Sequence, residues 1–212
     1  EGEPKEVTAQ YFRLLFGETK PVAGIAQTGT GVSTPDRAAA LRVEPGKNPS
    51  LKCLGDGGAD IHAITITGLQ PPNVFSGGEE ITIEIDFAWD TDTVRRLIDE
   101  RALNPNIGTG IAFCDRKGNY LFGCSTLTTG VNVDPRRGRR ALARLRMKLP
   151  ELVAGEYFAT VAVALGTQAM HVQLKWYDHL IHLVAQPARP SVDFYGVMRV
   201  EAVGELTYAK DP

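Results

Sequence analysis

Hydrophobic and polar residues alternate one by one along much of the chain between residues 79 and 165. In the clearest run, the apolar residues Ile81, Ile83, Ile85 and Phe87 alternate with Thr82, Glu84, Asp86 and Ala88. A later run alternates Leu145, Met147 and Leu149 with Arg144, Arg146 and Lys148. Because successive side chains of a strand point to opposite faces, this period of two indicates half-buried strands, with one face on a core and one in water.

Short segments that contain Gly and Pro separate these runs, as is typical of an all-β sandwich. We expect strands at about 39–44, 61–68, 80–89, 109–114, 120–127, 140–149, 155–165 and 172–184, and a last strand or pair within 194–208. Helical spacing of apolar residues predicts a short helix at 7–16, and composition predicts another at 92–103. The pattern therefore predicts an immunoglobulin-like or jelly-roll antiparallel β-sandwich with a short N-terminal helix.

Two local features refine this prediction. Residues 20–36 are rich in Gly, Thr, Pro and Ser, which is typical of a linker, so we divide the chain into a helix and linker at 1–36 and a sandwich at 37–212. The chain does not begin with Met, and we expect it to be part of a longer protein. Tyr157 follows the turn 149–155 and resembles the tyrosine corner of Greek-key sandwiches, in which the phenol hydroxyl ties down a loop.

Composition narrows the classes of function. The chain has 212 residues and a formal net charge of -2, which argues against nucleic acid as the main partner. It contains no apolar stretch long enough to cross a bilayer and no signal-peptide pattern at its start. Cys53, Cys114 and Cys124 are an odd number without metal-like spacing. They fit apolar fillers in a reducing compartment better than a disulfide framework, although Cys114 and Cys124 could lie close enough to pair.

The sequence contains none of the common catalytic motifs that we considered. It lacks both GxxxxGK[ST] and GxSxG, so we expect neither ATP hydrolysis nor a serine nucleophile from this chain. His171, His179 and His182 are not spaced to converge on one face of a strand, and we expect no metal and no cofactor. Glu84 and Asp86 lie on one strand face about 7 Å apart, as glycosidase carboxylates could, but any solvated strand gives that spacing.

A binding face agrees better with the pattern. If the strand of Glu84 and Asp86 neighbours the arginine-rich strand at 140–149, the outer face of the sheet carries cross-strand charge pairs. That face could be no more than a solvated surface, or it could form a polar groove in which planar polar groups and aromatic rings hold sugars. Only one of the adjacent residues Trp176 and Tyr177 can face such a groove. The carbohydrate-binding candidates are Glu84, Asp86, Trp89, Arg144, Arg146, Trp176 and Tyr177.

Several segments in order resemble one known family. They are Phe75-Ser-Gly-Gly-Glu79, Asn106-Ile-Gly108 with Ile111-Ala-Phe-Cys-Asp115, Tyr120-Leu-Phe-Gly123 with Ser125-Thr126, Leu149-Pro-Glu-Leu-Val-Ala-Gly155-Glu-Tyr157 and Trp176-Tyr-Asp178. Together they resemble the C-terminal domain of the Wzt type, found on ATP-binding subunits of ABC transporters that export O-antigen polysaccharide.

The resemblance implies an immunoglobulin-like sandwich that binds the O-antigen polysaccharide to be exported and thereby licenses export. It implies a homodimer that exchanges C-terminal strands, for which 194–200 would supply the strand and 186–190 the hinge. It also implies that residues 1–36 follow a nucleotide-binding domain, which contacts the membrane subunit at the cytoplasmic face of the inner membrane. Two alternatives stay open from the residues themselves: a jelly-roll enzyme that degrades glycans, and a module that only dimerises.

Overall fold

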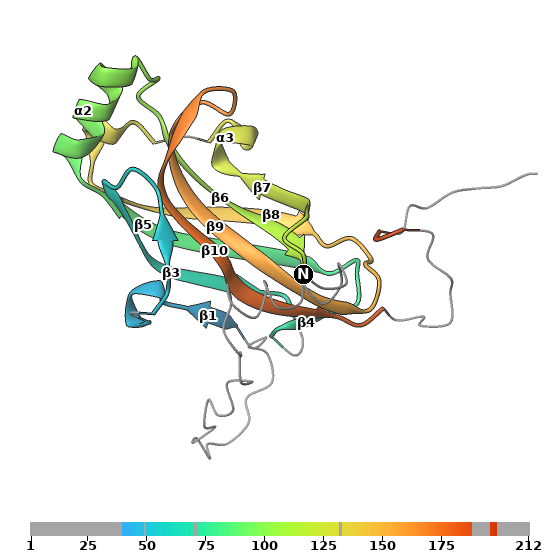
Figure 1. Ribbon diagram of the computed structural model, residues 1–212. Coiled ribbons are helices and arrows are strands. Elements are labelled where there is room, and N and C mark those ends of the chain that lie inside the picture. The colour runs from blue at the N-terminus through green and yellow to red at the C-terminus, as the bar shows by residue number, and fades with distance from the viewer. Residues whose placement is uncertain (1–39, 49, 70–71, 132, 188–195, 199–212) are drawn as a thin grey trace, which may run out of the picture. The chain divides into compact units, whose positions relative to one another are not determined.

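The computed structural model describes residues 40–48, 50–69, 72–131, 133–187 and 196–198 (Figure 1). Within this part the expected all-β sandwich is confirmed, because the chain folds into two sheets with only short helices between their strands. The helix expected at 7–16 and the linker at 20–36 lie outside the described residues. So does the strand expected within 194–208, apart from residues 196–198.

The first sheet has four strands in the order β1-β3-β5-β8, all antiparallel. They are β1 (Leu41–Val43), β3 (Ala59–Thr67), β5 (Glu80–Trp89) and β8 (Arg140–Lys148). The second sheet has six strands. Its main path is β2-β10-β9-β6-β7, and β4 pairs with β10 in parallel. They are β2 (Cys53–Leu54), β4 (Val74–Phe75), β6 (Ile107–Asp115), β7 (Tyr120–Ser125), β9 (Gly155–Gly166) and β10 (His171–Ala185).

Two α-helices and two short 3₁₀ helices connect the strands. They are α2 (Thr91–Arg101), α3 (Thr126–Thr129), η1 (Pro45–Lys47) and η2 (Pro135–Arg137). Helix α2 is the helix expected at 92–103, and it begins where the Asp90 carboxylate accepts a hydrogen bond from the backbone N–H of Thr93, at 2.8 Å. No helix among the described residues is both long enough and apolar enough to span a membrane.

Helix α3 differs from the expectation that a strand continues to residue 127. The Ser125 hydroxyl accepts from the backbone N–H of Thr128, and the Thr128 hydroxyl in turn accepts from the backbone N–H of Ser125. This reciprocal capping box satisfies two backbone donors and starts a helical turn directly after β7. The strand therefore ends at Ser125, and α3 lies against β6 and β7.

The alternation read from the sequence produces the core. Ile81, Ile83, Ile85 and Phe87 are each at most 2% exposed, and they face inward from the first sheet. The second sheet supplies Val161, Val163 and Leu165, each 0% exposed, from the inner face of β9. Burial of these side chains removes apolar surface from water and is the main favourable contribution to folding.

The turn before β9 is closed as the tyrosine-corner interpretation predicts. The Tyr157 hydroxyl donates a hydrogen bond to the carbonyl oxygen of Val153, at 2.8 Å, across the turn. Replacement of Tyr157 with phenylalanine should lower the free energy of unfolding by about 1 kcal/mol, because the bond is lost and a carbonyl loses its donor. Urea denaturation of both proteins measures the difference, and equal midpoints would show that the hydroxyl does not stabilise the turn.

Candidate functional site

The charged candidates lie on the outer face of the first sheet, as a ladder of cross-strand pairs. Strand β5 pairs with β8 in a register that sets Glu84 opposite Arg144. Nε of Arg144 donates to Oε1 of Glu84 at 2.8 Å. Arg140 makes a two-pronged contact with both carboxylate oxygens of Asp86. The predicted cross-strand charge pairs are therefore confirmed.

These pairs occupy the hydrogen-bonding groups that a sugar would need. The hydrogen bond from Arg140 holds the pKa of Asp86 below its ordinary value, so this carboxylate is ionised and engaged at neutral pH. A glycosidase needs one carboxyl group with a raised pKa to act as general acid, and the shift at Asp86 has the opposite sign. Exposed pairs of this kind contribute little to stability. Arg146, the remaining charged candidate, is exposed on β8 opposite Thr82.

Two of the aromatic candidates are buried in the core and cannot stack on a sugar. Trp89 is 4% exposed, and its Nε1 donates to the carbonyl oxygen of Pro135 at 3.1 Å. Tyr177 is 6% exposed and faces the core from β10. The expectation that only one of Trp176 and Tyr177 faces outward is confirmed, and it is Trp176 that does so. The proposed stacking role of Trp89 is corrected by its position, because Trp89 has the inward parity of Phe87 in β5 and its indole lies in the core.

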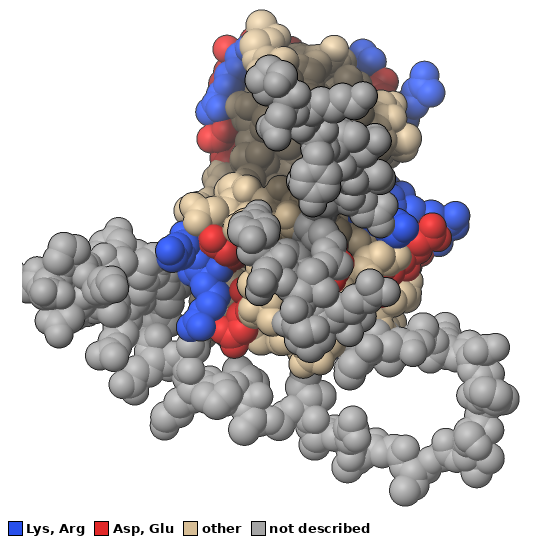
Figure 2. Space-filling view, turned by 90° about the vertical axis from the view of Figure 1, so that its right-hand side faces the viewer, with Lys and Arg blue, Asp and Glu red and all other residues tan. Residues whose placement is uncertain are grey.

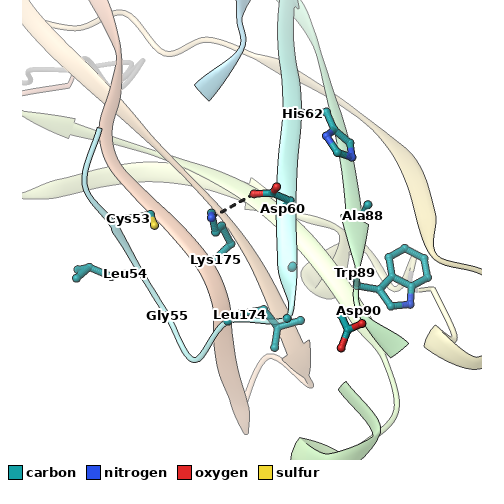
Figure 3. Close-up of a pocket in the computed structure, with 13 residues that line it drawn as sticks. Cys53, Leu54, Gly55, Asp60, His62, Ala88, Trp89, Asp90, Leu174 and Lys175 are labelled. Carbon is teal, nitrogen blue, oxygen red and sulfur yellow. Dashed lines mark ion pairs between the residues drawn. The ribbon is translucent and has the colours of Figure 1, made fainter. Parts of the chain in front are cut away.

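One pocket lies beside β2, the edge strand of the six-stranded sheet, and we call it the edge pocket (Figure 3). It has a volume of about 560 Å³ and lies between the β2–β3 segment, β5 and β10. Lys175 of β10 forms an ion pair with Asp60 of β3, with 3.2 Å between Nζ and Oδ1, and this pair links the sheets. In Figure 3 the indole of Trp89 points away from this pair. Trp89 thus lines the edge pocket away from the ion pair, and the Tyr177 ring, whose centroid is 5.5 Å from Nζ of Lys175, is buried.

The second pocket is a groove of about 420 Å³ on the outer face of the six-stranded sheet. Its floor exists because the outward positions from Gly108 to Ala112 of β6, and Ala162 and Ala164 of β9, carry small side chains. Strand pairing places these small residues side by side across the sheet, with Ala162 opposite Gly110 and Ala164 opposite Gly108. The floor consists of Gly108, Gly110, Ala112, Ala162 and Ala164. We call this hollow the small-residue groove.

Large side chains stand on both sides of that floor. Trp176 projects from β10 next to Ala162, and Tyr120 projects from β7. Their ring centroids are 6.3 Å apart at an interplanar angle of 86°, an edge-to-face contact. Tyr120 is 53% exposed. At one end, α3 brings Leu127 so close to Gly108 that a Cβ there would lie 2.5 Å from the Leu127 Cγ. The groove thus has an apolar floor and an aromatic wall.

A side chain that lines the groove carries a buried polar atom without a hydrogen-bond partner. Oε1 of Gln173, which lines the groove from β10, is buried and accepts no hydrogen bond; it is the only such side-chain atom among the described residues. A buried acceptor without a donor costs roughly 1–3 kcal/mol. A ligand or a water molecule that reaches the atom can supply the missing donor. Nearby, Nδ1 of His171 lies 3.0 Å from the carbonyl oxygen of Thr167.

A bulge in β10 sets a carboxylate beside the groove. Tyr177 pairs with Val161 and Ile181 with Ala159, so three residues of β10 lie opposite Thr160 alone. His179, the middle one, has a φ of 48°. The Thr160 hydroxyl donates to Oδ1 of Asp178 at 2.7 Å. Because Thr160 lines the groove, Asp178 is in contact with a lining residue without lining the groove itself.

Other chemistry is sparse in the described residues. No group of three or more His, Cys, Asp or Glu side chains is gathered there that could hold a metal ion. All three cysteines are free. On the face in Figure 2, basic and acidic residues lie next to one another at both flanks, and uncharged residues lie between them. That uncovered surface is mixed in charge, unlike a surface that tracks nucleic acid.

The seven predicted site residues are therefore not brought together. Glu84, Asp86, Arg144 and Arg146 lie on the outer face of one sheet, and Trp176 lies on the outer face of the other. Sequence reasoning missed Tyr120, Gln173 and the small residues of the floor. The sequence signal for the floor was the segment Ile107-Gly-Thr-Gly-Ile-Ala-Phe113, in which small residues alternate with larger ones.

Comparison with known proteins agrees with this architecture. The family model described as the Wzt C-terminal domain matches residues 53–200, which is more than half of the chain. Among solved structures, the chain is similar to one described as the crystal structure of the C-terminal domain of wzt. That structure is 18% identical in sequence with a TM-score of 0.56, and the match covers 76% of this chain and 90% of the other. At that identity, the structural likeness shows the fold alone. A search of curated proteins gave no match.

Proposed function

The chain belongs to the family of Wzt C-terminal domains, and from this premise we propose that it binds an O-antigen polysaccharide for an ABC exporter without altering the glycan. The observation that carries the proposal is the small-residue groove. It combines a smooth floor, two aromatic rings and a buried acceptor that lacks a donor. A sugar ring needs a flat apolar surface for its CH face and fixed polar atoms for its hydroxyl groups.

The groove supports this function better than the charged ladder does. The guanidinium groups of Arg140 and Arg144 already donate to the carboxylates beside them, and a sugar would have to compete with those pairs. Glu84, Asp86, Arg144 and Arg146 line neither the groove nor the edge pocket. In the groove, by contrast, the ring of Trp176 is partly exposed, and Oε1 of Gln173 has no hydrogen-bond partner. We therefore place the glycan over β6, β7, β9 and β10.

The proposal includes the assembly that the family implies. The domain would be attached through residues 1–36 to a nucleotide-binding domain at the cytoplasmic face of the inner membrane. It would form a homodimer by exchange of C-terminal strands. In the described part, residues 196–198 pair with the turn before β9. The backbone N–H of Val153 donates to the carbonyl oxygen of Val197 at 3.2 Å, next to an antiparallel bridge between Leu152 and Met198. Two sites in one dimer would strengthen binding to a repeating polymer by avidity.

The direct test is a binding screen of the 212-residue chain against purified bacterial O-polysaccharides, measured by biolayer interferometry. We expect at least one polysaccharide to bind and to keep its length on prolonged incubation. Shortened polysaccharide would identify a glycan-degrading enzyme. A stable dimer that binds no member of the panel would identify a module that only dimerises.

Substitution of Ala162 with leucine locates the site. Leucine at the centre of the floor should fill the groove and weaken glycan binding roughly tenfold or more, which is about 1.4 kcal/mol. Because Ala162 lies on the outer face, stability should change by only about 0.5 kcal/mol. The matched control is Ala88→Leu, which narrows the edge pocket instead. Weaker binding in the Ala88→Leu variant alone would place the glycan in the edge pocket.

A further inference from the structure

The small-residue groove is free of permanent charge along its lining. None of its lining residues is Asp, Glu, Lys or Arg. His171 is the one histidine among the lining residues. Binding sites for carboxylates and phosphates usually present arginine, lysine or a cluster of backbone N–H groups to the anion. The lining of this groove offers an acidic sugar neither arginine nor lysine.

The unpartnered oxygen of Gln173 requires a hydrogen-bond donor as its partner. An amide oxygen can only accept a hydrogen bond, so its missing partner must be a donor such as a sugar hydroxyl or an acetamido N–H. An ionised carboxylate or a phosphate diester has only acceptor oxygens. Such a group at this point would leave Oε1 of Gln173 unsatisfied and add repulsion between oxygen atoms.

The carboxylate of Asp178 makes the groove wall unfavourable to anions. Its side chain is 50% exposed and accepts from the hydroxyl of Thr160, a lining residue. Burial, and then the charge of Asp178, raise the pKa of the Tyr120 hydroxyl above its ordinary value. The same two causes raise the pKa of the Cys114 thiol to about 11. The charge of Asp178 therefore acts on Tyr120, a lining residue, and on Cys114, which lies in the sheet behind it. Nδ1 of His179 is 4.0 Å from the carboxylate.

We propose that the groove selects an uncharged sugar residue, whose hydroxyl or acetamido N–H donates to Gln173 and whose apolar face lies against Trp176, and that Asp178 disfavours acidic sugars. This inference rests on the proposed function, because it names the class of glycan that the same groove binds. The apolar floor of glycine and alanine suits a sugar whose buried edge carries hydrogen or methyl groups. Uronic acids and phosphorylated sugars belong to the excluded class.

The experiment compares O-polysaccharides of two kinds in one panel, neutral ones and ones that contain uronic acid or phosphate. Binding of the 212-residue chain is measured at one fixed pH for both kinds. We expect the tightest binders to be neutral. In Asp178→Asn, which keeps an oxygen acceptor for Thr160, affinity for acidic members should rise about three- to tenfold relative to neutral members, as expected from removing one charge near the ligand.

A second variant tests the unpartnered acceptor. Gln173→Met keeps the shape of the side chain and removes the amide oxygen. We expect binding of neutral polysaccharide to fall roughly tenfold, whereas the unfolding temperature of the free chain should rise or stay the same because an unsatisfied buried acceptor is gone. A purely structural role for Gln173 would instead lower stability and leave binding unchanged.

The outcomes separate the two proposals. If acidic polysaccharides bind most tightly, or if Asp178→Asn leaves the ratio of acidic to neutral binding unchanged, the charge selection is overturned while glycan binding stands. If no member of either kind binds to the wild-type chain or to either variant, the proposed function fails and the charge selection fails with it. Tight neutral binding combined with both variant effects supports the two together.

Discussion

Replacement of Trp176 with alanine is expected to weaken glycan binding by roughly thirtyfold, about 2 kcal/mol, while the free energy of unfolding changes little. The indole projects from β10 on the outer face of its sheet, beside Ala162, and contacts the ring of Tyr120 edge to face. Its removal takes away the widest flat surface in the groove. Because tryptophan is among the residues that most often dominate binding energy, this single change should have the largest effect on affinity.

Isothermal titration with the best polysaccharide of the screen measures the loss, and thermal unfolding shows that the variant is folded. The matched control is Arg144→Ala on the opposite outer face, which breaks the exposed pair with Glu84. An exposed pair contributes about 0–1 kcal/mol to stability, and we expect glycan binding of this control to be unchanged. Loss of binding in Arg144→Ala together with wild-type binding in Trp176→Ala would instead place the glycan on the charged ladder.

The outward facing of the charged ladder's residues was predictable from the sequence, whereas their pairing depended on β5 and β8 being neighbours. Alternation in the runs at 80–89 and 140–149 fixes which side chains face water, and Glu84, Asp86 and Arg144 all lie outward as expected. Strand β5 spans Glu80–Trp89, the range that the pattern predicts. A period of two is a local property that each strand carries in its own sequence, so neither the order of the strands nor their partners is needed to read it.

The groove was not predictable in the same way, because it depends on strand order. Trp176 and Tyr120 are 56 positions apart in the numbering. The strand order β10-β9-β6-β7 sets them on the two sides of the small-residue floor, over which their rings meet. The floor is marked by the absence of side chains, at Gly108 and Gly110, which a hydrophobic pattern does not register. Glycine within a strand does indicate close approach of another segment, and here a Cβ at Gly110 would lie 2.8 Å from the carbonyl oxygen of Cys124.

The inward position of Trp89 could be read from the alternation, although its hydrogen-bond partner could not. It has the inward parity of Phe87, and the two rings lie 5.9 Å apart in the core. The bond from its Nε1 to Pro135 requires η2, a short helix that the sequence pattern did not predict. A tryptophan can be almost completely buried when its N–H finds a backbone acceptor. The two tryptophans of the chain therefore have opposite roles, one in the core and one in the groove.

Replacement of Trp89 with alanine is accordingly expected to lower the free energy of unfolding by about 3–5 kcal/mol, because it leaves a large cavity in the core. Trp89→Phe should cost less, since it retains a ring and loses mainly the hydrogen bond to Pro135, worth about 1 kcal/mol. Urea denaturation measures both. The phenylalanine variant also leaves Trp176 as the one tryptophan, so a change in its fluorescence on addition of polysaccharide would report binding in the groove. An alanine variant as stable as the wild-type chain but unable to bind glycan would show that Trp89 contacts the ligand and that its burial in the core is not what stabilises the fold.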